Sequence, residues 1–191
     1  MKTPTKRDEI LQAALELIAE RGFHGAPMAM IAAKAGVGAG TIYRYFETKD
    51  VLIRELFEDL DAKIVAAIQE GYPNGKPFRE RFFHCWKALF RYMISHPLHF
   101  QYMEQYHNSP YGVALHRDRI FSKSDEPDIF RNLFEEAIAQ QVLKDLPLPV
   151  LFSLAFGPLL TLTRDYILGF IEMDDVLLTK TWEACWDGVK R

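Results

Sequence analysis

The chain of 191 residues is 49% hydrophobic and 26% charged, with a net charge of -3 at pH 7. These fractions are typical of a globular protein and exclude a chain that is disordered throughout. The two cysteines, Cys85 and Cys185, are far apart, so we expect buried apolar residues rather than a disulfide or a zinc site. The charged N-terminus lacks the apolar core of a signal peptide, and no uninterrupted apolar run is long enough to span a bilayer. We therefore expect a cytoplasmic protein with no membrane partner.

Apolar residues recur at helical spacing along the chain, and no segment alternates as a strand would. An all-α fold of about nine helices is therefore predicted. The first helix is expected to start near Thr5, which resembles a capping partner of Asp8, and to end at Gly22. Two short helices are expected over residues 27–35 and 39–46, with the proline that opens the former in its first turn.

A longer fourth helix is expected after Thr48, because leucine or isoleucine recurs at every fourth position from 52 to 68. The glycine- and proline-rich stretch 71–77 ends it. A fifth, aromatic helix follows as far as His96-Pro97, and a shorter aromatic helix comes next. Residues 108–126 are expected to be loop with at most one weak turn of helix. The remaining helices are predicted around residues 129–138, 148–170 and 174–190. The second of these three is apolar on nearly every side, so it must be covered all round.

The most informative segment spans residues 10–53. Two short helices behind a supporting first helix make a helix-turn-helix, whose core-facing residues would be Ile31, Ala32, Ala35, Ile42 and Phe46. The stretch GFHGAPMAMIAAKAGVGAGTIYRYFETKDVL, residues 22–52, resembles the signature of the TetR family of transcriptional regulators. The matching positions are Gly22, Phe23, Ile31, Ala32, Ala35, Gly36, Val37, Gly40, Thr41, Ile42, Tyr43, Tyr45, Phe46, Lys49 and Leu52.

The resemblance implies a helix-turn-helix DNA-binding domain at residues 1–50 and a larger helical ligand-binding and dimerisation domain at residues 51–191. The implied protein is a homodimeric regulator. As a repressor, it would be released from a pseudo-palindromic operator of double-stranded DNA by a small hydrophobic or amphipathic effector. The residues expected to contact DNA are Met28, Gly38, Ala39, Gly40, Thr41, Tyr43, Arg44, Tyr45 and Lys49.

Several of these side chains have chemistry that suits DNA contacts. The hydroxyls of Tyr43 and Tyr45 can hydrogen-bond phosphate oxygens, and Lys49 would meet a phosphate at the start of the fourth helix. Arg44, the one long cation in the middle of the third helix, could reach guanine or a phosphate. Gly40 would let this helix approach the major groove, and the small residues beside it could touch base edges.

The second domain is rich in bulky residues, which predict an apolar pocket, although such residues more often fill an ordinary core. The expected pocket residues are Trp86, Phe90, His99, Met103, Tyr106, Phe134 and Phe152. The last two helices would pair with a second copy across a twofold axis through Leu154, Leu162, Tyr166, Trp182 and Trp186. Glu104 and His107 form one i, i+3 pair of possible metal ligands, but a second pair is missing, so neither a metal nor a cofactor is predicted.

Residues 1–50 carry seven basic and six acidic side chains, which is nearly neutral for a DNA-binding segment. Ala26 and Gly38 also stand where the family often has hydroxyl residues. The alternative is therefore a helical small-molecule-binding or scaffold protein whose helix-turn-helix does not bind DNA. An enzyme is not expected, because the sequence has no nucleophile elbow, P-loop, paired carboxylates or metal-ligand cluster.

Overall fold

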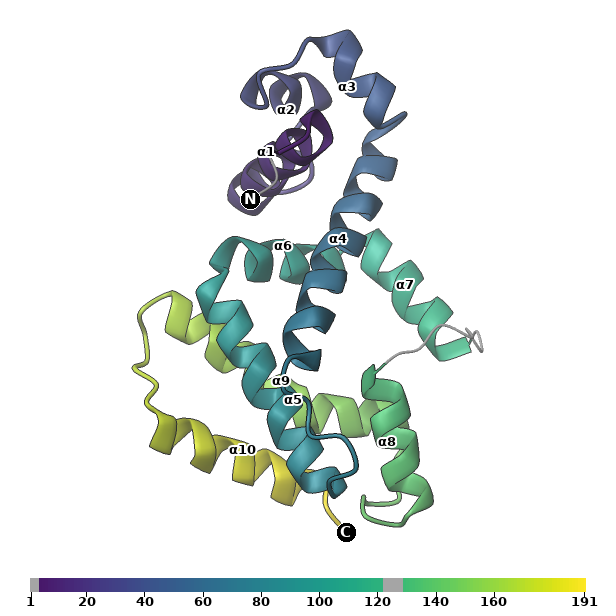
Figure 1. Ribbon diagram of the computed structural model, residues 1–191, viewed down its shortest axis with the longest axis vertical. Helices are drawn as coiled ribbons and strands as arrows, with labels where there is room; N and C mark the ends of the chain where they lie inside the picture. The colour runs from purple at the N-terminus through teal and green to yellow at the C-terminus, as the bar shows by residue number, and fades with distance from the viewer. Residues whose placement is uncertain (1–3, 122–128) are drawn as a thin grey trace. The chain divides into compact units, whose positions relative to one another are not determined.

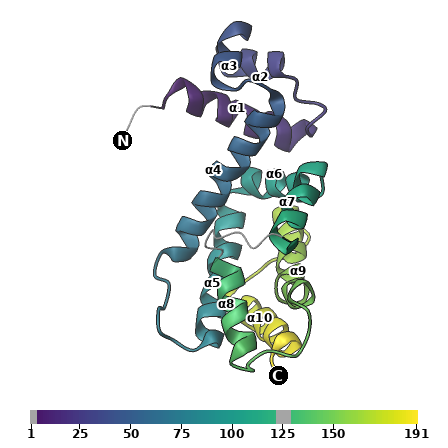
Figure 2. The same ribbon diagram turned by 90° about the vertical axis from the view of Figure 1, so that its right-hand side faces the viewer.

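The computed structural model describes residues 4–121 and 129–191, and in these ranges it contains ten helices and no strand (Figures 1 and 2). The helices are α1 (Lys6–Arg21), α2 (Met28–Lys34), α3 (Ala39–Tyr45), α4 (Lys49–Gln69), α5 (Phe78–Ser95), α6 (Pro97–His107), α7 (Pro110–Phe121), α8 (Ile129–Ala139), α9 (Leu148–Ile167) and α10 (Asp175–Val189). The all-α prediction is confirmed, with one helix more than the expected nine.

The chain divides into two compact units. The N-terminal unit, Met1–Lys63 with His96–Lys123, contains α1 to α3, most of α4, and α6 and α7. The C-terminal unit, Ile64–Ser95 with Ser124–Arg191, contains the end of α4, α5, and α8 to α10. Each unit therefore combines two separate stretches of chain. The expected domain boundary at residue 50 falls inside the N-terminal unit, because α6 and α7 group with the helix-turn-helix.

The start of α1 is confirmed in detail. The Asp8 amide donates to the Thr5 hydroxyl at 3.2 Å, and the Thr5 amide donates to the Asp8 carboxylate at 2.8 Å, which completes a capping box. The helix ends at Gly22, whose φ of 72° lies in the left-handed region that favours glycine. Seven residues of α1 are buried, and α1 packs against α2 and α6.

The two short helices are slightly shorter than expected. Pro27 lies just outside α2 as its N-cap, rather than in its first turn, and α3 ends at Tyr45, one residue before Phe46. Most of the expected core positions are buried: Ile31, Ala32, Ile42 and Phe46. Ala35 is only half-buried. This packing turns the remaining side chains of α3 outward.

Helix α7 lies where the sequence predicted a loop, and this expectation was wrong. A start signal is present, because Pro110 occupies the first helical position, where its missing N–H costs nothing. The preceding residue closes the first turn, since the Val113 amide donates to the Ser109 carbonyl at 3.0 Å. In the sequence of this segment the apolar residues follow no clear helical pattern, so periodicity alone could not reveal the helix. Residues 122–126 of the expected loop lie outside the described residues.

The C-terminal unit is held together by aromatic rings of α5. The Phe134 ring of α8 meets the rings of Phe78 and Phe82 edge-on, with centroids 5.5 and 5.6 Å apart. Arg81 of α5 donates to both carboxylate oxygens of Glu136 of α8, at 2.8 and 2.6 Å. Both cysteines are buried as expected, and burial raises the pKa of the Cys85 thiol to about 12.

Candidate functional site

The middle of α3 presents three neighbouring side chains to solvent. Tyr43 is 55% exposed and Tyr45 is 44% exposed, and Arg44 between them is exposed as well. Ile42 and Phe46 on the other face are fully buried, so they fix the rotation of the helix about its axis. The predicted outward presentation of the three residues is confirmed, and Figure 1 shows α3 between α2 and the start of α4.

The amino end of α3 is open. Ala39 and Gly40 are exposed, and the N-cap Gly38 has no side chain to cap the helix. A Cβ added at Gly40 would meet no atom within 4 Å, and one at Gly38 would lie 3.7 Å from the Thr41 hydroxyl. The fold itself therefore does not require glycine at residue 40, which leaves close approach by another molecule as a reason for it.

Two of the predicted DNA contacts take other positions in the structure. The side chain of Met28 is only 8% exposed, because the first turn of α2 packs onto the core, so it is not available to a groove. The Lys49 ammonium donates to the main-chain carbonyl of Phe23 in the turn between α1 and α2. Burial lowers the pKa of Lys49, while Asp50 opposes that shift. Lys49 thus ties two parts of the helix-turn-helix together.

Four of the other lysines and arginines between residues 4 and 50 have acidic partners. Lys6 pairs with Glu9 at 2.7 Å, Arg7 with Glu55 at 2.7 Å, Arg21 with Glu20 at 3.4 Å and Lys34 with Glu16 at 2.8 Å. Lys2 lies outside the described residues. Arg44 is therefore the one lysine or arginine in residues 4–50 whose charge has no partner within the described protein.

The predicted pocket residues of the C-terminal unit pack against one another. The rings of Phe134 and Phe152 are 4.7 Å apart, and Trp86 stacks on Phe90 with centroids 6.3 Å apart. The indole of Trp86 also donates to the Ala155 carbonyl of α9 at 3.1 Å. In this structure the four side chains act as core, and their part in an effector pocket stays a prediction.

The other predicted pocket residues belong to α6, in the N-terminal unit. Tyr106 stacks on Phe57 with ring centroids 4.0 Å apart, and Met103 is buried beside it in the same helix. His99 stacks on His96 with centroids 5.0 Å apart. Burial, with a smaller contribution from His96, lowers the pKa of His99 to about 4, so its imidazole is neutral at pH 7.

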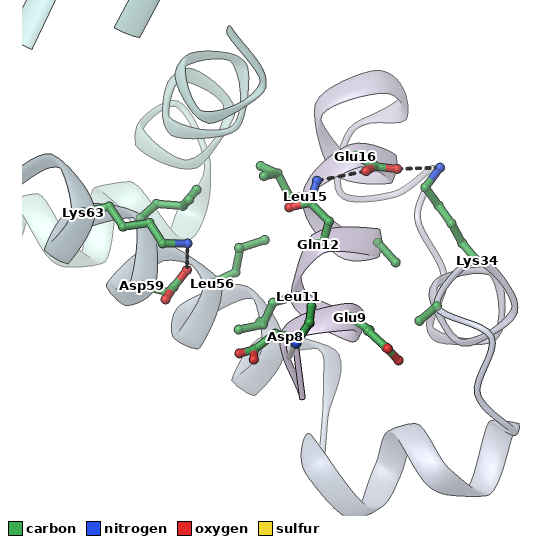
Figure 3. Close-up of a pocket in the computed structure, with 14 residues that line it drawn as sticks. Asp8, Glu9, Leu11, Gln12, Leu15, Glu16, Lys34, Leu56, Asp59 and Lys63 are labelled. Atoms are coloured by element: carbon green, nitrogen blue, oxygen red, sulfur yellow. Dashed lines mark hydrogen bonds and ion pairs between the residues drawn. The ribbon is translucent and has the colours of Figure 1, made fainter. Parts of the chain in front are cut away.

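A different cavity lies on the N-terminal unit, where α1 meets α2 and α4 (Figure 3). It encloses about 680 Å³, and none of the predicted pocket residues lines it. Four leucines form its apolar part, whereas carboxylates and lysines stand around them. Its lysines are already paired, Lys34 with Glu16 at 2.8 Å and Lys63 with Asp59 at 2.7 Å, as the dashed lines show. A mixed lining of this kind, whose lysines are already paired, gives no preference for one class of ligand.

The predicted dimer residues fall into two groups. Leu154 is 41% exposed and Tyr166 of the same helix is also exposed, whereas Leu162 is half-buried. Trp182 is only 3% exposed, since its ring lies 4.4 Å from Phe83 and under the guanidinium of Arg79. Trp182 is therefore a core residue of its own protomer, which corrects that prediction. Trp186 stacks parallel to Trp182 and is half-buried.

Helix α9 has one buried and one exposed face. Leu151, Ala155, Leu159 and Thr163, spaced four residues apart, are buried. The exposed face carries large apolar side chains, which are Val150, Leu154 and Leu160. By length and composition alone α9 could cross a bilayer, although the sequence suggested no such run, and only 22% of its most apolar window is buried within the chain. No group of three or more possible metal-ligating side chains occurs in the described parts of the chain.

Known proteins resemble this chain over nearly its whole length. Residues 10–56 match the model of "Bacterial regulatory proteins, tetR family", and residues 77–190 match "Tetracyclin repressor-like, C-terminal domain". An uncharacterised helix-turn-helix-type transcriptional regulator of Haemophilus influenzae is 24% identical over 184 residues, which cover 96% of this chain and 95% of that one.

Solved structures agree with these matches. A TetR family transcription regulator from Marinobacter aquaeolei is 25% identical, with a TM-score of 0.83 over 97% of this chain and 96% of the other. A TetR family protein from Vibrio parahaemolyticus is 33% identical, with a TM-score of 0.77 over 98% of this chain and the full length of the other. The likeness therefore extends from the helix-turn-helix through the C-terminal helices.

Proposed function

Because the chain belongs to the TetR family of helix-turn-helix transcriptional regulators, we propose that it binds a pseudo-palindromic operator through α3. The observation that carries this proposal is the outward presentation of Tyr43, Arg44 and Tyr45 above a buried apolar face. A helix of this kind fits the major groove, where side chains reach base edges and phosphates together.

Each exposed residue of α3 has a separate role in the proposed complex. Arg44 donates two hydrogen bonds to guanine O6 and N7, or binds a phosphate, because its charge is not already paired. The hydroxyls of Tyr43 and Tyr45 donate to phosphate oxygens on either side. At the amino end of α3, Ala39 and Gly40 are exposed and Thr41 is half-buried, which allows close approach to the base edges. We do not retain Met28 and Lys49 among the contacts.

The proposed active form is a homodimer that pairs α9 and α10 with their copies. The exposed apolar face of α9 supports this pairing, since such a face is otherwise left in water. Next to it, α10 presents the small residues Ala184 and Gly188, which allow helices to approach closely. Two copies of α3 would then enter successive major grooves about 34–36 Å apart.

A membrane would be another way to cover α9. Two charged residues, Arg164 and Asp165, lie inside this helix, and the family matches place it in a regulator domain. We therefore propose a second copy as its cover and the cytoplasm as the site of action. Ligand-responsive repression is the general role of the family. We propose a small hydrophobic or amphipathic effector for this chain, which releases DNA to the extent that it prefers the unbound form.

Fluorescence anisotropy with genomic DNA fragments tests the proposal. The wild-type dimer should select one fragment in a salt-sensitive manner, and Arg44→Ala should weaken that binding about ten- to a hundredfold. Tyr43→Phe should weaken it less, because a single phosphate contact is lost. Lys76→Ala removes an exposed cation in the loop before α5 and serves as the matched control, with affinity unchanged.

The second candidate is a helical binding or scaffold protein that does not use DNA. The pairing of most cations in the helix-turn-helix favours it. It predicts that no genomic fragment binds selectively and that Arg44→Ala behaves as wild type. We propose no catalytic role, in keeping with relatives that are transcriptional regulators.

A further inference from the structure

The first turn of α4 sets the position of α3. Only residues 46–48 separate the end of α3 from the start of α4, and Phe46 among them is fully buried. Because the linker is short and its first residue is fixed in the core, a shift of α4 would be passed on to α3. Whatever holds the first turn of α4 therefore also holds the exposed residues of α3 in place.

Two tyrosines from α6 and α7 hold the beginning of α4 by their hydroxyls, one at its second residue and one at its fifth. Tyr111, the second residue of α7, donates to a carboxylate oxygen of Asp50. Tyr102 of α6 donates to the main-chain carbonyl of Ile53 at 2.6 Å, in a buried position. Burial and the Asp50 carboxylate raise the pKa of Tyr111 to about 12, so its hydroxyl keeps the proton that it donates.

Phe23 contacts Lys49 and both of these tyrosines. The carbonyl of Phe23 accepts from the Lys49 ammonium, and its ring meets the rings of Tyr111 and Tyr102 edge-on at 5.6 and 6.0 Å. Lys49 and Asp50 are neighbours in the first turn of α4. Lys49 ties this turn to the α1–α2 turn, and Asp50 ties it to α7. Figure 1 shows α6 and α7 next to α4.

The start of α7 is itself fixed tightly. A Cβ added at Gly112 would lie 2.4 Å from the Tyr106 carbonyl oxygen and 2.5 Å from the Cα of His107. Only glycine allows α7 to begin this close to the end of α6. The Ser109 hydroxyl donates to the same Tyr106 carbonyl at 2.6 Å. The close packing of α7 on α6 thus fixes the position from which the Tyr111 hydroxyl reaches Asp50.

We infer that Tyr111 and Asp50 are positioning residues for operator binding, which hold α3 in the orientation that recognises DNA. The inference rests on the proposed function, because it assumes that α3 contacts the operator. Neither residue would touch DNA itself. They act through the first turn of α4, and α7 belongs to the DNA-reading part of the molecule although it lies far from it in sequence.

For the substitution Asp50→Ala, electrostatics alone and the positioning role predict opposite changes in operator affinity. Asp50→Ala removes a negative charge from a unit that binds a polyanion, so electrostatics alone would strengthen operator binding. If Asp50 positions α3, the same substitution weakens binding. Glu47→Gln supplies the matched control, because Glu47 is an exposed carboxylate three residues away that has no such tie. Its removal should leave the affinity equal to or higher than that of the wild type.

The experiment measures the affinity of full-length dimers for the fragment that the wild type selects. Tyr111→Phe keeps the ring contacts and removes only the hydroxyl. The two single variants Tyr111→Phe and Asp50→Ala should each weaken operator binding about tenfold. Asp50→Asn keeps an oxygen that accepts the hydrogen bond, so it should bind within about threefold of the wild type. The Tyr111→Phe/Asp50→Ala double variant should be no weaker than either single variant, because both remove one bond.

Several results would overturn the inference. It fails if Asp50→Ala binds the operator as tightly as Glu47→Gln does. It also fails if Asp50→Asn binds as weakly as Asp50→Ala, or if the two losses add in the double variant. Circular dichroism of each variant checks that helicity is kept, and Tyr111→Phe is the variant least able to perturb it. If the wild type selects no fragment, the proposed function itself fails. If the wild type binds and only Arg44→Ala is weakened, this inference fails alone.

Discussion

At residue 49 the ammonium group lies against a backbone carbonyl, and this decides what a substitution there should change. If Lys49 served only to bind phosphate, Lys49→Met would leave the free protein as stable as the wild type. Because it donates to the Phe23 carbonyl, the substitution leaves that acceptor without its partner. We expect a loss of about 1.5 kcal/mol in the free energy of unfolding without DNA. Thermal unfolding followed by circular dichroism measures it, and an unchanged midpoint would restore the phosphate role.

His99 gives the protein a pH dependence whose sign follows from its burial. Its pKa is about 4 in the folded chain, below the ordinary value of 6.5. Between these two values the unfolded chain takes up a proton that the folded chain does not, so stability should fall as the pH decreases from about 6.5 towards 4. Denaturant unfolding at several pH values should give a shallower fall for His99→Gln than for the wild type. His24→Gln, which changes an exposed histidine, should leave the slope unaltered.

At the scale of elements, α9 exposes an apolar face that the proposed dimer would cover. Leu154 lies on its exposed face, so Leu154→Glu should leave the fold of the protomer intact and place a charge in the proposed dimer interface. Sedimentation velocity should then show a shift from dimer to monomer at micromolar concentration. Val113→Glu, at an exposed apolar position of α7, is the control that should remain dimeric. A Leu154→Glu protein that stays dimeric would place the interface elsewhere.

Helix α7 depends on a close approach at a single glycine. Gly112→Ala forces a methyl group against the backbone of α6, so the unfolding midpoint should drop by several degrees and operator binding should weaken with it. Gly40→Ala is the matched substitution at a position with open space, and we expect its midpoint to be unchanged or higher. If both variants unfold at the wild-type temperature, α7 is not fixed by this contact.

At the scale of the whole molecule, the helix-turn-helix carries few unpaired cations, so its affinity for DNA should depend only weakly on salt. Each protomer offers Arg44 as its unpaired cation in residues 4–50, so few counterions are released from DNA. A plot of log affinity against log salt for the dimer should therefore have a slope of about -2. Anisotropy titrations at several KCl concentrations between about 50 and 200 mM measure this slope. A slope near -6 would mean that the paired lysines and arginines exchange their partners for phosphates.

Sequence alone determined the features that depend on neighbouring residues. The capping pair of Thr5 and Asp8 and the spacing of Ile42 and Phe46 follow from local chemistry, and so does the outward turn of Tyr43 to Tyr45. These features sufficed to predict the helical class and the exposed face of α3. Only the tertiary structure decided the partners of Lys49 and Trp182, because a side chain's role depends on which distant groups fold against it. It also brought Tyr111 to Asp50, sixty-one residues away, a pairing that no periodicity or motif could indicate.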